Sequence, residues 1–150
     1  MTTMKTILSF LMIGLFFPVP QWSGDFEKAQ VEATQNNNYI LLNFCGSDWC
    51  GPCIKLKKDI FESADFQQYA EKHLVLVRAD FPRQKKNQLE VAQTAHNEAL
   101  AEKYNPQGKF PFTLLLDANG KVLKEWEGYP KTLNTLGFVH DIALVADAAK

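Results

Sequence analysis

Apolar residues along this chain gather in a few short runs, separated by more polar segments with helical spacing. Residues 39–44 and 74–79 are almost continuously apolar, which is typical of strands covered on both faces of a sheet. Residues 112–116 are followed by a turn sequence at 117–120 and then by residues 122–126, which predicts an antiparallel hairpin. Together these runs predict a central mixed β-sheet.

Helical periodicity fills the intervals between the predicted strands. The expected helices cover residues 25–35, two to three turns from Cys53, residues 65–72, 84–104 and 132–148. The last helix should bury one apolar face, made of Leu133, Leu136, Val139, Ile142 and Ala143. Because helices separate the runs at 39–44 and 74–79, those two strands should be parallel and joined by a right-handed crossover. The pattern predicts a three-layer α/β domain over residues 22–150.

Residues 1–21 have the pattern of an export signal. Lys5 supplies the positive charge, and the apolar stretch 7–17 is too short to span a bilayer. No small-x-small cleavage site is evident around residues 18–22, so an uncleaved N-terminal anchor is the alternative. We expect an exported protein that is soluble once the signal is removed.

Composition narrows the choice of partners. The chain of 150 residues is 46% apolar, enough for the core of one domain, and its formal net charge is -1. No run of Lys or Arg is longer than the short cluster at residues 83–86, so we expect no nucleic-acid binding. Proteins and small thiols are the expected partners.

The chemistry of the chain is concentrated in Trp49-Cys50-Gly51-Pro52-Cys53, which lies between a predicted strand and a predicted helix. Helix N-terminal amides favour a thiolate at Cys50, which makes it the expected attacking residue. Pro52 suits the first helical turn, where its missing N–H costs nothing. Cys53 lies one turn further in, should be more buried, and would resolve a mixed disulfide formed by Cys50.

Two other interpretations of the cysteines stay open. The spacing Cys45-x4-Cys50-x2-Cys53 matches that of some iron–sulfur ligands, but there is no fourth cysteine, and His73, His96 and His140 fall in other helical stretches. The second alternative is a binding or chaperone module in which Cys50 and Cys53 form a structural disulfide. The odd third cysteine, Cys45, is expected to be a small residue at a strand end, with pairing to Cys50 or redox sensing as alternatives.

The dithiol sequence after a buried strand, together with Lys109-Phe110-Pro111-Phe112 before the third strand, resembles the thioredoxin family. Trp22, Asp25 and Ala29 ahead of the dithiol are especially similar to exported bacterial thiol–disulfide interchange proteins. The resemblance covers residues 22–149 and implies the thioredoxin-like fold.

In that family the segment around Phe110 pairs with the substrate as an added strand, and Pro111 follows a cis peptide bond beside Cys50. The resemblance therefore implies a substrate groove framed by Trp49, Gly51, Pro52, Phe110, Pro111, Gly128 and Tyr129.

The chain departs from the thioredoxin pattern at two places. Thioredoxins carry a buried acid on the strand before the dithiol, whereas the residues here are Asn43 and Phe44, which cannot take a proton. Resolution by Cys53 would then use water or another carboxylate, with Asp48 and Asp80 as candidates. The long predicted helix 84–104, which precedes the cis-proline loop, is an addition whose role the sequence leaves open.

The resemblance also bears on direction and partners. Gly51-Pro52 is similar to the reducing members of the family, so we expect a periplasmic enzyme that reduces or exchanges disulfides in exported proteins. A reductant in an oxidising compartment needs electrons from a membrane partner. We expect a monomer that has no cofactor or metal apart from the Cys50–Cys53 disulfide.

Overall fold

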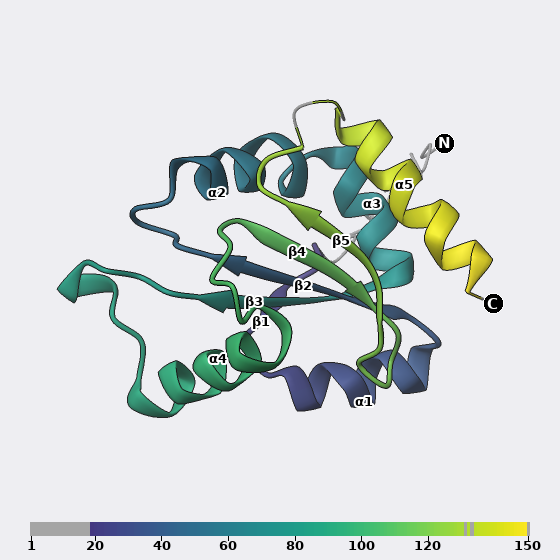
Figure 1. Ribbon diagram of the computed structural model, residues 1–150. Helices are drawn as coiled ribbons and strands as arrows, with labels where there is room; N and C mark the ends of the chain where they lie inside the picture. Colours follow the sequence, from purple (N-terminus) through teal and green to yellow (C-terminus); the bar gives the residue numbers. More distant parts are fainter. Residues whose placement is uncertain (1–18, 131, 133, 150) are drawn as a thin grey trace, which may run out of the picture.

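A mixed sheet of five strands forms the centre of the described part of the chain, residues 19–130, 132 and 134–149 of a computed structural model (Figure 1). In spatial order the strands are β1 (Trp22–Ser23), β3 (Leu74–Asp80), β2 (Tyr39–Cys45), β4 (Phe112–Leu116) and β5 (Val122–Glu127). β2 pairs in parallel with β3 and antiparallel with β4, and β4 pairs antiparallel with β5. The predicted crossover and hairpin are both confirmed.

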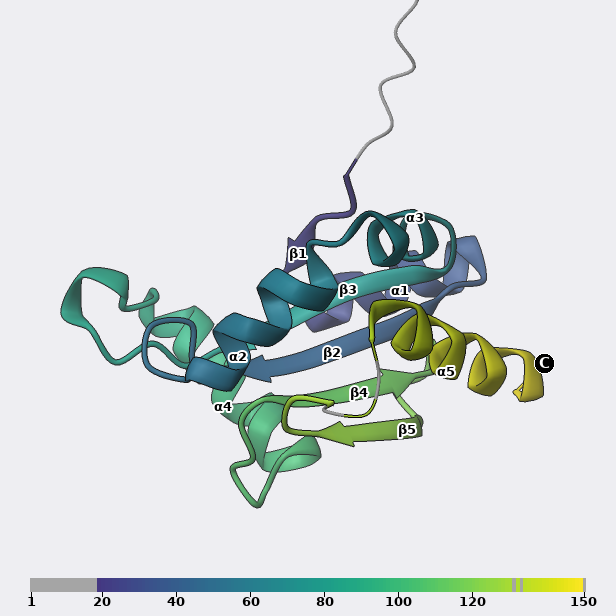
Figure 2. The same ribbon diagram turned by 90° about the horizontal axis from the view of Figure 1, so that it is seen from above.

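Helices cover both faces of the sheet (Figures 1 and 2). One face carries α1 (Phe26–Asn36) and α4 (Val91–Tyr104). The other carries α2 (Gly51–Leu56), the π-helical turn η1 (Lys57–Phe61), α3 (Ala64–His73) and α5 (Thr135–Ala148). This is the three-layer α/β arrangement that the sequence predicts.

The continuous apolar character of β2 follows from its central position. Ile40, Leu42 and Phe44 contribute to the core on the α1 and α4 side, whereas Leu41 contributes to the core under α2, α3 and α5. All four side chains are fully buried. Because side chains alternate along a strand, Asn43 and Cys45 lie on the same face as Leu41, which is the face of the dithiol.

The predicted helix 84–104 is wrong over its first seven residues. Residues 85–87 form a short 3-10 turn, η2 (Lys85–Asn87), and α4 begins only at Val91. The physical reason is tertiary: the Asp48 carboxylate accepts hydrogen bonds from the backbone N–H groups of Arg83 and Gln84 at 2.9 Å each. These bonds hold the segment as a loop although it contains neither glycine nor proline.

The last helix also differs from its prediction. α5 begins at Thr135 rather than at residue 132, after Asn134 as its N-terminal cap. Leu136, predicted to be buried, is 61% exposed, and Phe138 is fully buried instead. Val139 packs against the core and Ile142 is buried, as predicted, whereas Leu133 lies outside the described residues.

The N-terminal prediction cannot be compared with the structure, because residues 1–18 lie outside the described residues. Among the residues that are described, none of the helices combines the length and apolar character needed to cross a membrane. The two-residue strand β1, which pairs in parallel with β3, was not predicted.

Candidate active site

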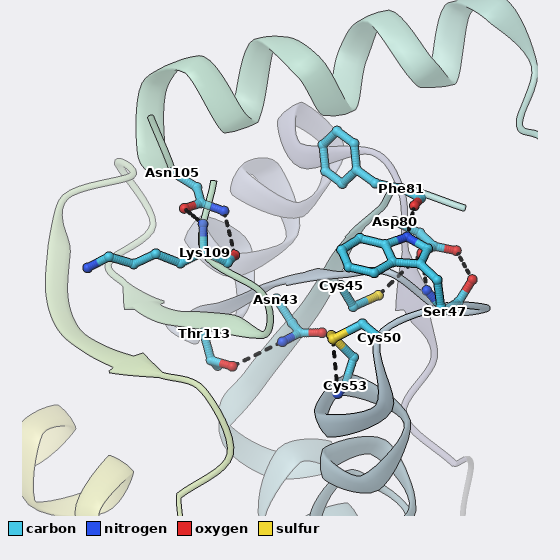
Figure 3. The surroundings of a disulfide bond; sticks show 11 residues. Asn43, Cys45, Ser47, Cys50, Cys53, Asp80, Phe81, Asn105, Lys109 and Thr113 are labelled. Carbon is cyan, nitrogen blue, oxygen red and sulfur yellow. Dashed lines mark hydrogen bonds between the residues drawn. A yellow bond between two sulfur atoms is a disulfide. The ribbon is translucent and has the colours of Figure 1, made fainter. Parts of the chain in front are cut away.

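Cys50 and Cys53 are joined by a disulfide at the start of α2, with their Cα atoms 5.2 Å apart (Figure 3). Cys50 is the N-terminal cap of α2, and its Sγ accepts a hydrogen bond from the Cys53 backbone N–H at 3.3 Å. Both residues are 5% exposed, so the expectation that Cys53 would be the more buried of the two is not met in the oxidised form. Their difference lies in position: the sulfur of Cys50 faces the free N–H groups of the helix end, where a thiolate is stabilised.

The cis-proline loop is present beside the dithiol. The Phe110–Pro111 peptide bond is cis, as the resemblance implied, and the Phe110 side chain packs against the cluster of three cysteines. Gly128 donates its N–H to the Pro111 carbonyl at 2.8 Å, with a φ of 71°. Four of the residues predicted to frame a groove, counting Trp49, are therefore brought together with the dithiol.

Asn105 holds the start of the cis-proline loop. It is 3% exposed, and its side chain both accepts from the Lys109 N–H and donates to the Lys109 carbonyl, at 2.8 Å each (Figure 3). The sequence analysis treated this residue only as part of a helix-breaking Asn-Pro turn. An amide that pairs with both backbone groups of a residue four positions later leaves no pattern by which it could be recognised.

Trp49 connects the dithiol to the segment after β3. Its indole N–H donates to the Phe81 carbonyl at 2.7 Å, and the Arg83 guanidinium lies 3.7 Å from the ring centroid. On its other side the ring meets Phe110 edge to face, with centroids 5.4 Å apart. The tryptophan is therefore held between this segment and the cis-proline loop.

The remaining groove candidates lie around α2. Gly51 and Pro52 are exposed at its start. The Tyr129 hydroxyl donates to Asp59 at 3.1 Å, and Lys55 lies 4.4 Å from the centre of the Tyr129 ring. Tyr129 is therefore fixed to the first turns after the dithiol.

The two candidate proton acceptors are engaged elsewhere. Asp48 accepts hydrogen bonds from Arg83, Gln84 and Asn87, and the bond from the Arg83 backbone is the main reason why its pKa is lowered. Asp80 accepts from the Ser47 N–H and hydroxyl and from Cys45 (Figure 3). Within the described residues neither carboxylate has a hydrogen bond to Cys53, and a lowered pKa makes Asp48 a poor base. The contacts of both acids argue against the role.

Asn43 lies behind the disulfide. Its side chain is 2% exposed and donates to the Thr113 hydroxyl at 3.0 Å, across the β2–β4 pair (Figure 3). Phe44 points to the other face of the sheet. A neutral amide therefore lies behind the disulfide, on the strand where the resemblance to thioredoxins implied a buried acid.

Cys45 is a free, buried thiol at the end of β2. Burial, followed by the nearby charge of Asp80, raises the pKa of Cys45 to about 12. Its Sγ donates to Asp80 Oδ1 at 3.5 Å. A thiol with this pKa stays protonated at neutral pH and is a poor nucleophile.

A search of the described residues for three or more His, Cys, Asp or Glu side chains placed to hold a metal ion finds none. His73, His96 and His140 lie on α3, α4 and α5, on three helices other than the one that carries the dithiol.

Comparisons with known proteins agree with this geometry. The sequence model of the thioredoxin-like domain matches residues 26–137, so the chain belongs to the thioredoxin-like family. A curated relative, the disulfide bond reductase DsbH of Chlamydia pneumoniae, is 40% identical over 103 residues, which are 69% of this chain and 60% of that protein. The matched region is thus less than two thirds of the relative's length.

Two solved structures extend the comparison. A structure described as DsbH oxidoreductase superposes with a TM-score of 0.77 at 28% identity, covering 97% of this chain and 95% of that one. A disulphide isomerase from Xylella fastidiosa Temecula1 has a TM-score of 0.58 at 19% identity, covering 79% and 86% of the two chains, and supports the fold alone.

Proposed function

We propose that this protein is a thiol–disulfide oxidoreductase that reduces or exchanges disulfides in exported proteins. One observation carries the proposal: the Cys50–Cys53 disulfide caps α2 directly beside the cis Phe110–Pro111 bond. A structural disulfide has no need of a helix end that stabilises its thiolate, whereas a redox disulfide is cleaved and reformed through that thiolate.

The reaction follows from the positions of the two sulfurs. In the reduced protein the Cys50 thiolate attacks one sulfur of a substrate disulfide, the substrate S–S bond breaks, and its other sulfur leaves as a thiol. The Cys53 thiolate then attacks Cys50 Sγ, which forms the intramolecular disulfide and releases the second substrate thiol. The substrate gains two electrons, and the protein loses two.

Among the described residues, no carboxylate is hydrogen-bonded to Cys53 and placed to receive its proton. Asn43 is an amide, and Asp48 and Asp80 are engaged by other donors. We assign this step to water.

Direction and compartment belong to the same proposal. The matched relative is called a disulfide bond reductase, which supports the reducing direction. The signal-like residues 1–21 support export to the periplasm, where a membrane-bound thiol donor would return two electrons to Cys50–Cys53. We propose a monomer that uses the dithiol as its sole redox group.

The test is reduction of insulin by the purified protein with dithiothreitol as electron source. Acceleration is expected, and Cys53→Ser should accumulate a mixed disulfide between Cys50 and the substrate, seen by mass spectrometry. Cys45→Ser is the matched control, because it removes a thiol from the same cluster and should not trap substrate. An insulin reduction rate equal to that of dithiothreitol alone, with no trapped species, would favour a binding module with a structural disulfide.

The reduction potential separates the directions. A value near the roughly -270 mV of thioredoxin is expected for a reductase. A value near the roughly -120 mV of strong periplasmic oxidants would reverse the proposed direction while leaving the exchange chemistry intact.

A further inference from the structure

Residues 83–87, which we call the basic loop, carry three cations in four positions: Arg83, Lys85 and Lys86. All three side chains are exposed. Among the ion pairs of the described residues, none involves any of the three. On a chain whose net charge is -1, this is a local concentration of unneutralised positive charge.

The basic loop lies next to the dithiol. In Figure 1 the segment between β3 and α4 and the loop between β2 and α2 leave the sheet at the same end. Arg83 stacks on the ring of Trp49, the residue directly before Cys50, at 3.7 Å from the ring centroid. The guanidinium therefore lies against the residue that directly precedes the attacking cysteine.

The loop is also held in place. Asp48, two residues before Cys50, accepts from the backbone of Arg83 and Gln84 and from the Asn87 side chain, at 2.9 Å each. The bonds go to neutral N–H groups, so the carboxylate fixes the loop without pairing with any of its cations. Set against the carboxylates of Asp48 and Asp80, the three cations of the basic loop leave a formal excess of one positive charge in this part of the structure.

We propose that the basic loop selects substrates whose disulfide is flanked by acidic residues. Fixed cations beside the reacting sulfur attract a negatively charged segment, speed its encounter and orient it on Trp49, whereas a positively charged segment is repelled. The inference rests on the proposed function and adds a substrate class to it.

The test uses three synthetic peptides with one internal disulfide, identical except that the residues flanking the cystine are all Glu, all Gln or all Lys. The second-order rate constant for reduction of each peptide by the reduced protein is measured at low salt and at about 0.5 M salt. The Glu peptide should react roughly tenfold faster than the Lys peptide at low salt. Added salt should bring the ratio close to one, which tests the proposal on the unaltered protein.

Two charge-matched variants localise the effect. Arg83→Gln/Lys85→Gln/Lys86→Gln should collapse the ratio of Glu to Lys peptide rates. The control Lys28→Gln/Lys72→Gln/Lys121→Gln removes three exposed lysines from α1, α3 and the β4–β5 turn and should preserve the ratio.

Failures of the two proposals are distinguishable. Equal rates for all three peptides on the unaltered protein, or a ratio that both variants lower equally, would overturn the role of the basic loop while reduction itself continues. Failure to reduce even the Gln peptide would overturn the oxidoreductase function and the substrate preference with it.

Discussion

Two carboxylates near the dithiol are used in opposite ways. Asp48, before Cys50, binds backbone N–H groups of the basic loop and leaves its cations unpaired. Asp59, on η1 after Cys53, pairs with the Lys55 ammonium at 3.1 Å and accepts from Tyr129. The first arrangement fixes a loop and preserves its charge, whereas the second fixes a tyrosine and neutralises the nearby lysine. The cations of the basic loop therefore stay unpaired, whereas the ammonium of Lys55 is paired.

The largest effect on stability is expected from Gly46→Ala, which should separate Trp49 from the basic loop. A Cβ at this position would overlap the Trp49 indole, which must move and give up its bond to Phe81 and its contact with Arg83. Overpacking of this kind lowers the free energy of unfolding by about 1–3 kcal/mol. Chemical denaturation of Gly46→Ala and of the unaltered protein measures this loss in free energy of unfolding.

Gly51→Ala is the matched control for that change. A Cβ at Gly51 has no heavy atom within 4 Å, and the residue lies in the first turn of α2, where alanine is the better helix former. The free energy of unfolding of Gly51→Ala should equal or slightly exceed that of the unaltered protein. An equal loss in both variants would mean that the indole contact does not set the cost.

A smaller loss is expected from Gly128→Ala, which acts next to Tyr129 and leaves the basic loop intact. Gly128 has a φ of 71°, a left-handed conformation that costs a residue with a Cβ roughly 1–2 kcal/mol. Space is not the cause, since an added Cβ meets nothing within 4 Å. Gly128→Asn should recover part of the loss, because asparagine tolerates this region. Denaturation midpoints measure the stability of both variants. An equal loss of stability in Gly128→Ala and Gly128→Asn would contradict the backbone explanation.

Removing each carboxylate should loosen only its own region. In Asp48→Ala the backbone amides of Arg83 and Gln84 lose their acceptor, and their hydrogen exchange should accelerate by roughly three- to tenfold. In Asp59→Ala those two amides should exchange as before. Acceleration at Arg83 in both variants would show that the two regions are coupled.

The smallest effect is a dependence on pH. Hydrogen bonds from Arg83, Asn87 and Gln84 lower the pKa of Asp48 from its ordinary 3.8, so these bonds hold the loop fully above that value. Protection of the Arg83 and Gln84 amides should be constant at neutral and mildly acid pH. It should then be lost as the pH falls below 3.8 and through the lowered pKa. The amide chemical shifts of Arg83 and Gln84, followed from about pH 6 to about pH 2, report the loss of these hydrogen bonds. A transition near pH 6 would contradict the assignment to Asp48.

Three central strands of the sheet could be predicted from sequence because they are largely buried on both faces. The runs at 39–44, 74–79 and 112–116 have no polar face, so apolar continuity alone locates them. The two-residue strand β1 is too short to carry any periodicity. Phe138, which the predicted apolar face omits, is buried in place of Leu136 because it packs against Phe61 and Trp126 from other elements.

The site was predictable where chemistry is local. Cys50, Cys53 and the cis bond before Pro111 follow from short motifs. The role of Asp48 in holding the basic loop could not be predicted. It depends on hydrogen bonds to residues 35 to 39 positions later, which no local sequence pattern encodes. The same contact explains why residues 84–90 are not helical.

The burial of Cys45 has a consequence for the fidelity of pairing. Three cysteines allow three internal disulfides, of which the observed one joins Cys50 to Cys53. Because burial raises the pKa of Cys45 to about 12, its thiol stays protonated at neutral pH. A buried, protonated third thiol is therefore a weak competitor of Cys53 for the sulfur of Cys50.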